Sequence, residues 1–193
     1  MPAGAAPLAV QPWPGPPAAP RDGVFVIGVA GPAGAPRAWA RGQVRLAARQ
    51  ALAQLAGLPP EHIQIAAQPG RAPRALWDGG AAGLSFSHAD GLSLAAVNLG
   101  GDVGVDLMRV GDWPDWQAVA RDYLGPATAE ALARCAPGQR ARAFAQAWTA
   151  REASLKYAGL ALGEWMPGVP ARAWRSLTLA LPAGLAGTLA LPA

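Results

Sequence analysis

Glycine and proline set the strongest limit on how this chain can fold. Its 193 residues include 24 glycines and 20 prolines. Because both residue types interrupt helices and strands, the sequence predicts many turns and short elements. The longest helix that the pattern predicts in the second half of the chain is 140–159, which ends at its own glycine. A hydrophobic content of 52% with 15% charged residues is typical of a folded chain with a core.

Strands and helices are predicted in both halves of the chain. Before residue 100 we expect strands at 24–30, 84–86 and 92–98, an alternating stretch at 62–66, a loop at 68–83 and a helix at 38–57. That helix carries an apolar stripe of Val44, Ala47, Ala48, Ala51, Leu52 and Leu55. After residue 100 we expect a strand at 103–110, helices at 116–124, 127–135 and 140–159, and a closing hairpin of 173–181 with 185–191.

These elements predict an α+β protein made of two similar α/β lobes that meet near residue 100. We expect an N-terminal lobe at 23–100 and a C-terminal lobe at 101–193. Residues 1–22 form a Pro/Ala-rich extension, which we expect to be loosely ordered.

The basic residues are scattered along the chain. The net charge is +4 and the pI about 10.2, and Lys156 is the single lysine among the 16 basic residues. A nucleic-acid binder usually gathers such residues on one face or in an arm, so the pattern does not favour that class. The open alternatives are a solvated arginine-rich surface, a cleft for a polyanion, and a face for an acidic partner.

Cellular location is indicated only by what the sequence lacks. With Cys135 as the single cysteine, no intrachain disulfide can form, which favours a reducing compartment. We find no classical signal peptide, and prolines and glycines interrupt the uncharged segment 176–193, so we expect no membrane span. We therefore expect a cytoplasmic protein.

The long helix carries the first candidate site. Trp148, Glu152 and Lys156 follow one another at four-residue spacing and share one stripe. One interpretation is a packed tryptophan beside an ordinary surface ion pair. The other is a reactive site, because the chain uses arginine elsewhere and a compact lysine ammonium suits phosphate or proton transfer.

The strand at 103–110 carries the second candidate. Val103, Val105 and Leu107 point to one side of it, and Gly104, Asp106 and Met108 point to the other. A buried carboxylate is costly unless it is paired or bound to a metal. Asp106 is therefore expected to cap a turn, to pair with an arginine such as Arg109, or to bind Mg²⁺.

The third candidate is the Ser87-His88 pair, which we place in a turn between two apolar strands. A histidine in a turn is more often structural than catalytic, so both roles stay open for His88.

The order of the three candidates is more specific than any one of them. A Ser-His pair, then Gly104-Val105-Asp106-Leu107, then a helix with Trp148, Arg151, Glu152 and Lys156 resembles the 4′-phosphopantetheinyl transferase superfamily in its surfactin-type, single-chain form. The segment Gly70-Arg71-Ala72-Pro73 looks like the family's Gly-Lys-Pro loop with one added residue. The resemblance covers about residues 38–165.

The resemblance implies a fold and a reaction. Two α/β lobes related by a pseudo-twofold axis would enclose coenzyme A in the cleft between them. The enzyme would transfer the 4′-phosphopantetheine group to a serine of an apo acyl or peptidyl carrier protein and release adenosine 3′,5′-bisphosphate. Asp106 and Glu152 would bind Mg²⁺, with Mn²⁺ as a possible substitute.

The resemblance also implies roles for single residues. Glu152 would be the general base, and Lys156 would stabilise the departing bisphosphate. Contacts to the phosphates or the adenine of coenzyme A would come from Arg41, Arg71, Ser87, His88 and Arg151, with Arg37 and Arg45 as further candidates for the 3′-phosphate. We expect a monomer that binds acidic carrier proteins, and neither nucleic acid nor membranes.

Met108 departs from the family pattern, because many members carry a second acidic residue at that position. It motivates the alternative of a degenerate member that binds coenzyme A or a carrier protein without transfer. A nucleic-acid-binding protein is the alternative from another class, motivated by the pI alone.

Overall fold

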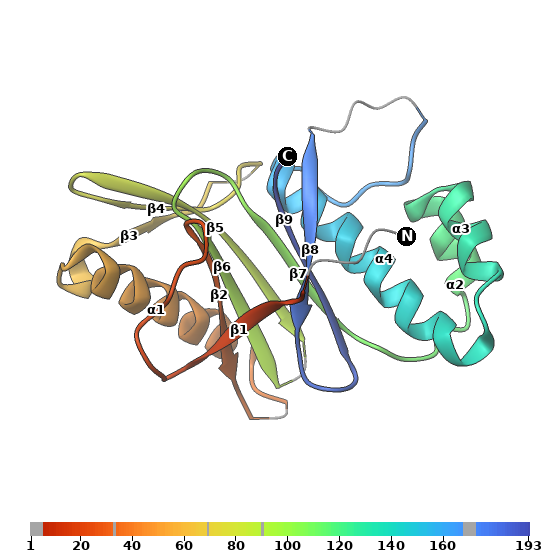
Figure 1. Ribbon diagram of the computed structural model, residues 1–193, viewed down its shortest axis with the longest axis horizontal. Helices are drawn as coiled ribbons and strands as arrows, with labels where there is room; N and C mark the ends of the chain where they lie inside the picture. The colour runs from red at the N-terminus through yellow and green to blue at the C-terminus, as the bar shows by residue number, and fades with distance from the viewer. Residues whose placement is uncertain (1–5, 33, 69, 90, 168–172) are drawn as a thin grey trace.

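The computed structural model describes residues 6–193, apart from 33, 69, 90 and 168–172. It is a mixed α+β fold in which a curled nine-stranded sheet lies between two long helices, α1 (Arg37–Ala56) and α4 (Pro137–Ala158) (Figure 1). The strand order is β3-β4-β5-β6-β2-β1-β8-β9-β7. Within the described residues, no helix combines the length and apolar character that crossing a membrane would need.

The other elements follow in chain order. The first half contains β1 (Leu8–Trp13), β2 (Val24–Ala30), the 3-10 turn η1 (Pro60–His62), β3 (Gln64–Ala66), β4 (Arg74–Trp77), β5 (Gly80–Ala89) and β6 (Leu92–Asn98). The second half contains β7 (Gly104–Arg109), α2 (Trp116–Val119), the π-helix η2 (Ala120–Leu124), α3 (Pro126–Ala133), β8 (Trp174–Ala180) and β9 (Leu185–Pro192). The β8–β9 hairpin is confirmed.

The two long helices form as predicted. Each ends where a glycine takes a left-handed backbone conformation, Gly57 at φ 66° and Gly159 at φ 70°. In both, the glycine N–H bonds to a carbonyl of the last turn. A residue with a Cβ would adopt this left-handed backbone conformation only under strain. The predicted stripe of α1 is buried except for Leu55, which is exposed.

The expectation that residues 1–22 are loosely ordered is wrong for Leu8–Trp13. This segment is β1, which pairs in parallel with β2 on one side and with β8 on the other (Figure 1). Leu8 and Val10 pack into the cluster between the halves of the sheet, and Trp13 packs into the cluster under α1. Alternating side chains therefore bury apolar surface on both faces, which stabilises the strand despite the prolines around it.

The placement of Ser87-His88 in a turn is also wrong. Strand β5 continues to Ala89, and Ser87 lies opposite Leu94 and His88 opposite Ser93 of β6. Pairing with β6 extends the strand beyond its apolar part, and local sequence does not show that pairing. The segment predicted as a loop at 68–83 likewise contains β4, which pairs with β3 and β5.

Two buried clusters fill the two sides of the curled sheet. One lies under α1 and includes Phe25, Val44 and Leu52. The other joins β2 and β6 to β7, β8 and β9, and Val103, Val105 and Leu107 all belong to it. The opposite face of β7 is covered by α4, so the predicted two-sided division of this strand is confirmed. The edge of β7 next to β5 positions the candidate site.

Candidate active site

Strand β7 lies directly against α4 because Gly104 has no side chain. A Cβ at this position would overlap the carbonyl oxygen of Ala153 and crowd the backbone nitrogen of Tyr157. Farther along the same face, Met108 packs in a cluster with Phe144 and Trp148. Asp106 lies between these two contacts, so the strand presents its carboxylate to the middle of the helix.

Asp106 is buried and paired with Lys156, not with its sequence neighbour Arg109. The Lys156 Nζ lies 2.7 Å from Asp106 Oδ1, and the Ser87 hydroxyl donates to the same oxygen at 2.9 Å. Lys156 also donates to Val105 O at 3.1 Å and to Phe86 O at 3.5 Å. One side chain of α4 therefore connects β7 to β5 and compensates the buried carboxylate.

Glu152 lies one helical turn before Lys156 and is half-buried. Burial raises the pKa of its carboxyl group, and the negative charge of Asp106 raises it further, against the opposing charges of Lys156 and Arg151. Asp106 therefore lies close enough to Glu152 for the two carboxylates to interact electrostatically. The surface-pair interpretation of Glu152 and Lys156 does not describe this site, because Lys156 makes its ion pair with Asp106.

The two carboxylates are a plausible ligand set for a divalent ion. The described residues contain no group of three or more histidine, cysteine or acidic side chains arranged around one point. Mg²⁺ in proteins is commonly held by one or two carboxylates together with waters and substrate phosphates, so two suffice. Both hydrogen bonds to Asp106 reach Oδ1, and among the described residues no donor contacts Oδ2. The donor set therefore fits the ion.

His88 lies near the arginines of α1. Its Nδ1 shares a hydrogen bond of 2.9 Å with the Ser93 hydroxyl. Burial lowers the pKa of His88, and the positive charges of Arg41, Arg37, Lys156 and Arg45 lower it further. Arg37 and His88 line a cavity of about 200 Å³ at the start of α1. This electropositive surrounding suits an anion.

Two further arginines approach the site from other directions. The guanidinium of Arg45 lies over the Phe86 ring, 5.6 Å from its centroid. The Nε of Arg151 is buried without a hydrogen-bond partner in the described part of the chain. An orphaned buried donor one residue before Glu152 is a candidate contact for a bound anion.

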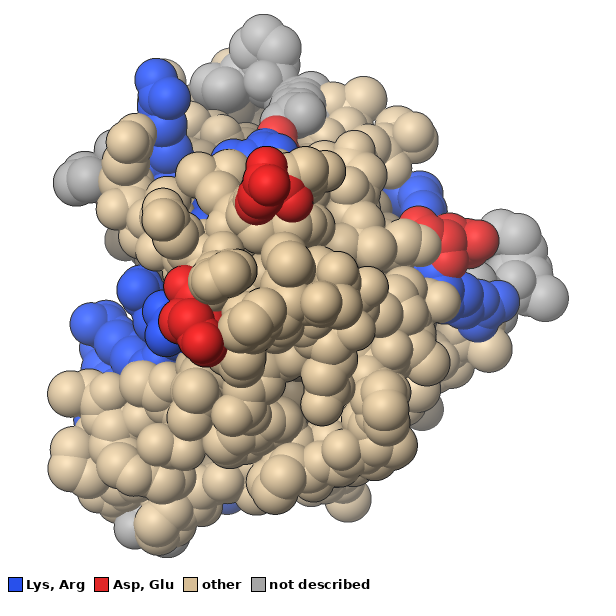
Figure 2. Space-filling view, turned by 90° about the vertical axis from the view of Figure 1, so that its left-hand side faces the viewer, with Lys and Arg blue, Asp and Glu red and all other residues tan. Residues whose placement is uncertain are grey.

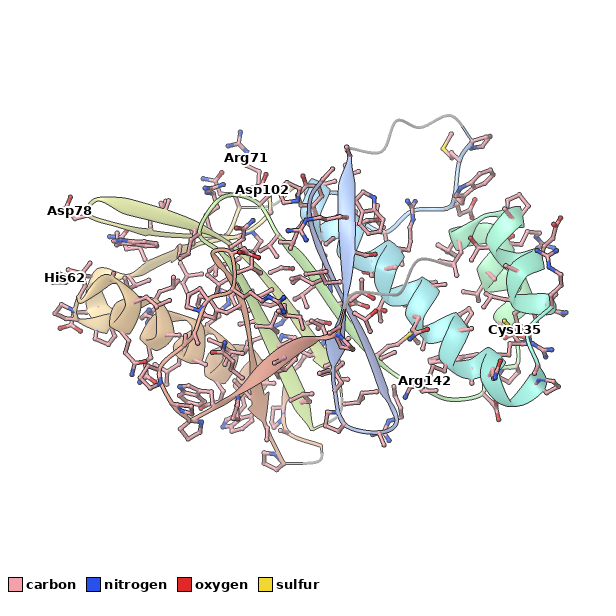
Figure 3. All side chains as sticks on the ribbon, viewed as in Figure 1. His62, Arg71, Asp78, Asp102, Cys135 and Arg142 are labelled. Carbon is pink, nitrogen blue, oxygen red and sulfur yellow. The ribbon has the colours of Figure 1, made fainter. Side chains whose placement is uncertain are left out.

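Among the described residues, the side chains bonded to Asp106 are Ser87 and Lys156, and neither Arg71 nor Trp148 is one of them. The loop with Arg71 packs against Gly159, where α4 ends, and its side chain is exposed (Figure 3). Trp148 stacks on Phe144 and meets Tyr123 edge-on, so this residue of the helix motif is part of the core.

Basic side chains also gather at one edge of the face at the α1 end, although they are scattered in the sequence (Figure 2).

Ser85 is a residue near the site that the sequence patterns did not indicate. Its Oγ accepts the backbone N–H of Val105 at 2.9 Å, and the residue is 3% exposed. The available signal was a pair of serines two residues apart on a buried strand, which places both hydroxyls on one face.

Comparison with known proteins agrees with the motif order. Residues 102–185 match the family model described as 4′-phosphopantetheinyl transferase superfamily. The chain is 28% identical over 123 residues to slr0495 of Synechocystis sp., which its name assigns provisionally to the 4′-phosphopantetheinyl transferases. It is 32% identical over 76 residues to the 4′-phosphopantetheinyl transferase HetI of Nostoc sp..

These matches are partial on both sides. They cover 60% and 39% of this chain, and the chain spans about half the length of slr0495 (48%) and about a third of HetI (32%). The matched segment includes β7 and α4, and therefore Asp106, Glu152 and Lys156. The resemblance predicted from the motifs is confirmed: residues 102–185 are similar to the 4′-phosphopantetheinyl transferase superfamily.

Proposed function

We propose that the protein transfers 4′-phosphopantetheine from coenzyme A to a serine of an apo acyl or peptidyl carrier protein and releases adenosine 3′,5′-bisphosphate. One observation carries the proposal: Asp106 of β7 and Glu152 of α4 are charge neighbours beside Lys156. They lie in the part of the chain that matches the family.

In this proposal Asp106 and Glu152 hold Mg²⁺, and Mn²⁺ can replace it. The ion, when bound, neutralises negative charge on the diphosphate of coenzyme A. Lys156 forms an ion pair with Asp106 at 2.7 Å and so places a positive charge beside it. Of its three contacts, the one to Phe86 O at 3.5 Å is the longest and the easiest to exchange for an oxygen of the departing bisphosphate.

Glu152 acts as the general base in the proposed reaction. Burial raises the pKa of Glu152, and a carboxylate whose pKa is raised is a stronger base than an ordinary one. It accepts the proton of the attacking serine hydroxyl of the carrier protein.

Binding of coenzyme A is assigned to the basic side chains around this site. His88 and Arg41 contact phosphate oxygens of coenzyme A, and the unpartnered Nε of Arg151 donates to another. Ser87 orients Asp106, and Arg71 lies nearest the nucleotide end of coenzyme A.

Coenzyme A lies between two lobes, 23–100 and 101–193, related by a pseudo-twofold axis, and the extension 1–22 precedes them. We propose a cytoplasmic monomer whose partners are acidic carrier proteins, with no role for nucleic acid or membranes.

A transfer assay tests the proposal. The protein is incubated with coenzyme A, Mg²⁺ and a panel of purified apo carrier proteins from fatty acid, polyketide and nonribosomal peptide pathways. At least one carrier is expected to gain the mass of one phosphopantetheine, and a carrier whose acceptor serine is changed to alanine should gain nothing. No mass gain on any carrier would contradict the proposed reaction.

A binding protein without transfer activity is the second candidate, and Met108 supports it. Its side chain packs in the apolar cluster of α4 instead of offering a third carboxylate. This alternative predicts that coenzyme A binds and protects the protein against heat while every carrier stays unmodified.

A duplex-DNA gel shift at low salt tests the nucleic-acid alternative, for which binding should weaken steeply with salt.

A further inference from the structure

Strands β5 and β7 lie side by side without a backbone ladder between them. They are far apart in the strand order, yet two hydroxyls of β5 bond to the backbone of β7. Ser85 Oγ accepts the Val105 N–H at 2.9 Å, and Ser87 Oγ accepts the Leu107 N–H at 3.1 Å. The two serines and the two amides share a two-residue spacing, so side chains replace the missing ladder.

Lys156 adds a third connection between the same strands. Its ammonium donates to Phe86 O on β5 and to Val105 O on β7. We call Ser85, Ser87 and Lys156 the seam. Among the described residues, every hydrogen bond between β5 and β7 involves a side chain of the seam.

The two serines of the seam bond to different groups near the site. The Ser87 hydroxyl bonds to the Asp106 carboxylate directly. Within the described part of the chain, the Ser85 hydroxyl bonds only to the backbone N–H of Val105, the residue before Asp106. Ser85 is also buried too deeply to touch a bound donor or a carrier protein. A buried N–H without an acceptor is costly, so the Val105 amide depends on this hydroxyl.

We propose that Ser85 is a positioning residue for the metal site. Its hydroxyl fixes Val105 and thereby sets where Asp106 stands relative to Glu152. Contact of Gly104 with Ala153 holds the strand to the helix on one face, and Ser85 holds its edge one residue before the carboxylate. This role rests on the proposed function, because it concerns metal binding by the same two carboxylates.

Three variants test the role of Ser85. Ser85→Ala removes the acceptor, Ser85→Thr keeps it, and Thr188→Val is the matched control. Thr188 is a buried residue of β9 whose hydroxyl bonds to Thr149 at 2.9 Å, so its loss also breaks a buried hydrogen bond beside α4. If Ser85→Ala does not fold, Ser85→Cys takes its place, since sulfur is a weak acceptor of similar size.

The first measurement is amide hydrogen exchange, which does not depend on activity. In Ser85→Ala the Val105 amide should exchange about three- to tenfold faster, the scale of one lost buried hydrogen bond. It should be unchanged in Thr188→Val and restored in Ser85→Thr. Unchanged Val105 exchange in Ser85→Ala would overturn the proposal.

The second measurement is the metal requirement. Mn²⁺ binding, followed by the electron paramagnetic resonance of the free ion with coenzyme A present, should weaken several-fold in Ser85→Ala and not in Thr188→Val. The Mg²⁺ concentration for half-maximal transfer should rise in parallel. Equal Mn²⁺ affinities in Ser85→Ala and wild type, or no Mn²⁺ binding by the wild type, would overturn the positioning role.

Failure of the proposed function is distinguishable from failure of this inference. A wild type that modifies no carrier contradicts transfer, while weakened Mn²⁺ binding in Ser85→Ala still supports the positioning role. A wild type that transfers normally, with Ser85→Ala unchanged in its metal requirement, contradicts only the role of Ser85.

Discussion

Lys156 donates to two backbone carbonyls and one carboxylate, which lie on two strands. An ammonium has three N–H groups around one atom, so each of its protons has an acceptor here. A guanidinium is a planar fork and directs its donors differently. This geometry explains why a chain that otherwise uses arginine carries lysine at this position.

Replacing Lys156 by arginine should therefore lower the transfer rate by far more than the loss of a surface pair, for which about 0.5 kcal/mol, or roughly twofold, is expected. The measurement is kcat and KM for coenzyme A. Glu130→Gln is a matched control, because Glu130 forms an exposed pair with Arg134 at a spacing of four residues on a helix. Equal, small effects of both changes would make Lys156 an ordinary pair.

Glu152→Gln should reduce transfer by orders of magnitude while the protein stays folded.

Glu152→Gln should also change how stability depends on pH in metal-free buffer. Because the folded pKa of Glu152 is raised, its protonated form is favoured in the folded state, and stability is lost as pH rises above its ordinary value of 4.5. Glutamine does not ionise, so the variant should be more stable than wild type at pH 7 and about equal at pH 4. Urea unfolding at both pH values measures this, and a variant less stable at pH 7 would contradict it.

At the scale of elements, the site depends on how closely β7 approaches α4. The contact is possible because position 104 has only a hydrogen atom facing the helix backbone. Gly104→Ala should separate strand and helix, lower stability by a few kcal/mol, as overpacking does, and lower transfer by moving Asp106 away from Glu152. Denaturant unfolding and the transfer assay check both effects.

Two glycines in open space provide controls for this prediction. Gly111→Ala should be nearly neutral, because nothing lies within 4 Å of the added methyl group. Gly42 lies inside α1 with equally open surroundings, so Gly42→Ala should stabilise the protein by up to about 1 kcal/mol. Equal effects at positions 104 and 111 would show that the close approach is unimportant.

Elements that depend on local pattern were predicted from the sequence, and elements that depend on a distant partner were not. The runs at 24–30 and 92–98 match β2 and β6, and α1 and α4 differ from their predicted bounds by a few residues. Strand β1 pairs with β8, which no local window contains. Strand β4 and the continuation of β5 through His88 form hairpins with the strand that follows each of them, and the apolar pattern alone did not indicate these. The motif order selected Asp106, Glu152 and Lys156, which the fold brings together. It missed Ser85, whose partner is a backbone amide of a strand 20 residues away.

At the scale of the whole molecule, β1 joins the two halves of the sheet. It pairs with β2 in one half and with β8 in the other, and Val10 packs over Gly28. Val10→Asp should place a charge in the cluster between the halves and destabilise the protein by several kcal/mol. Ala9→Asp, at an exposed position of the same strand, should have little effect. Thermal unfolding compares them, and equal melting temperatures would argue against β1 as a structural link.

The position of β1 also has a consequence for how the chain is made. Its segment is translated long before one of its two partners, β8, which follows residue 173. Until then one side of β1 exposes unpaired backbone groups, a state that favours association with other nascent chains. Completion of the sheet therefore waits until β8 has been made, and a chain that stops before β8 should form aggregates rather than a stable fragment.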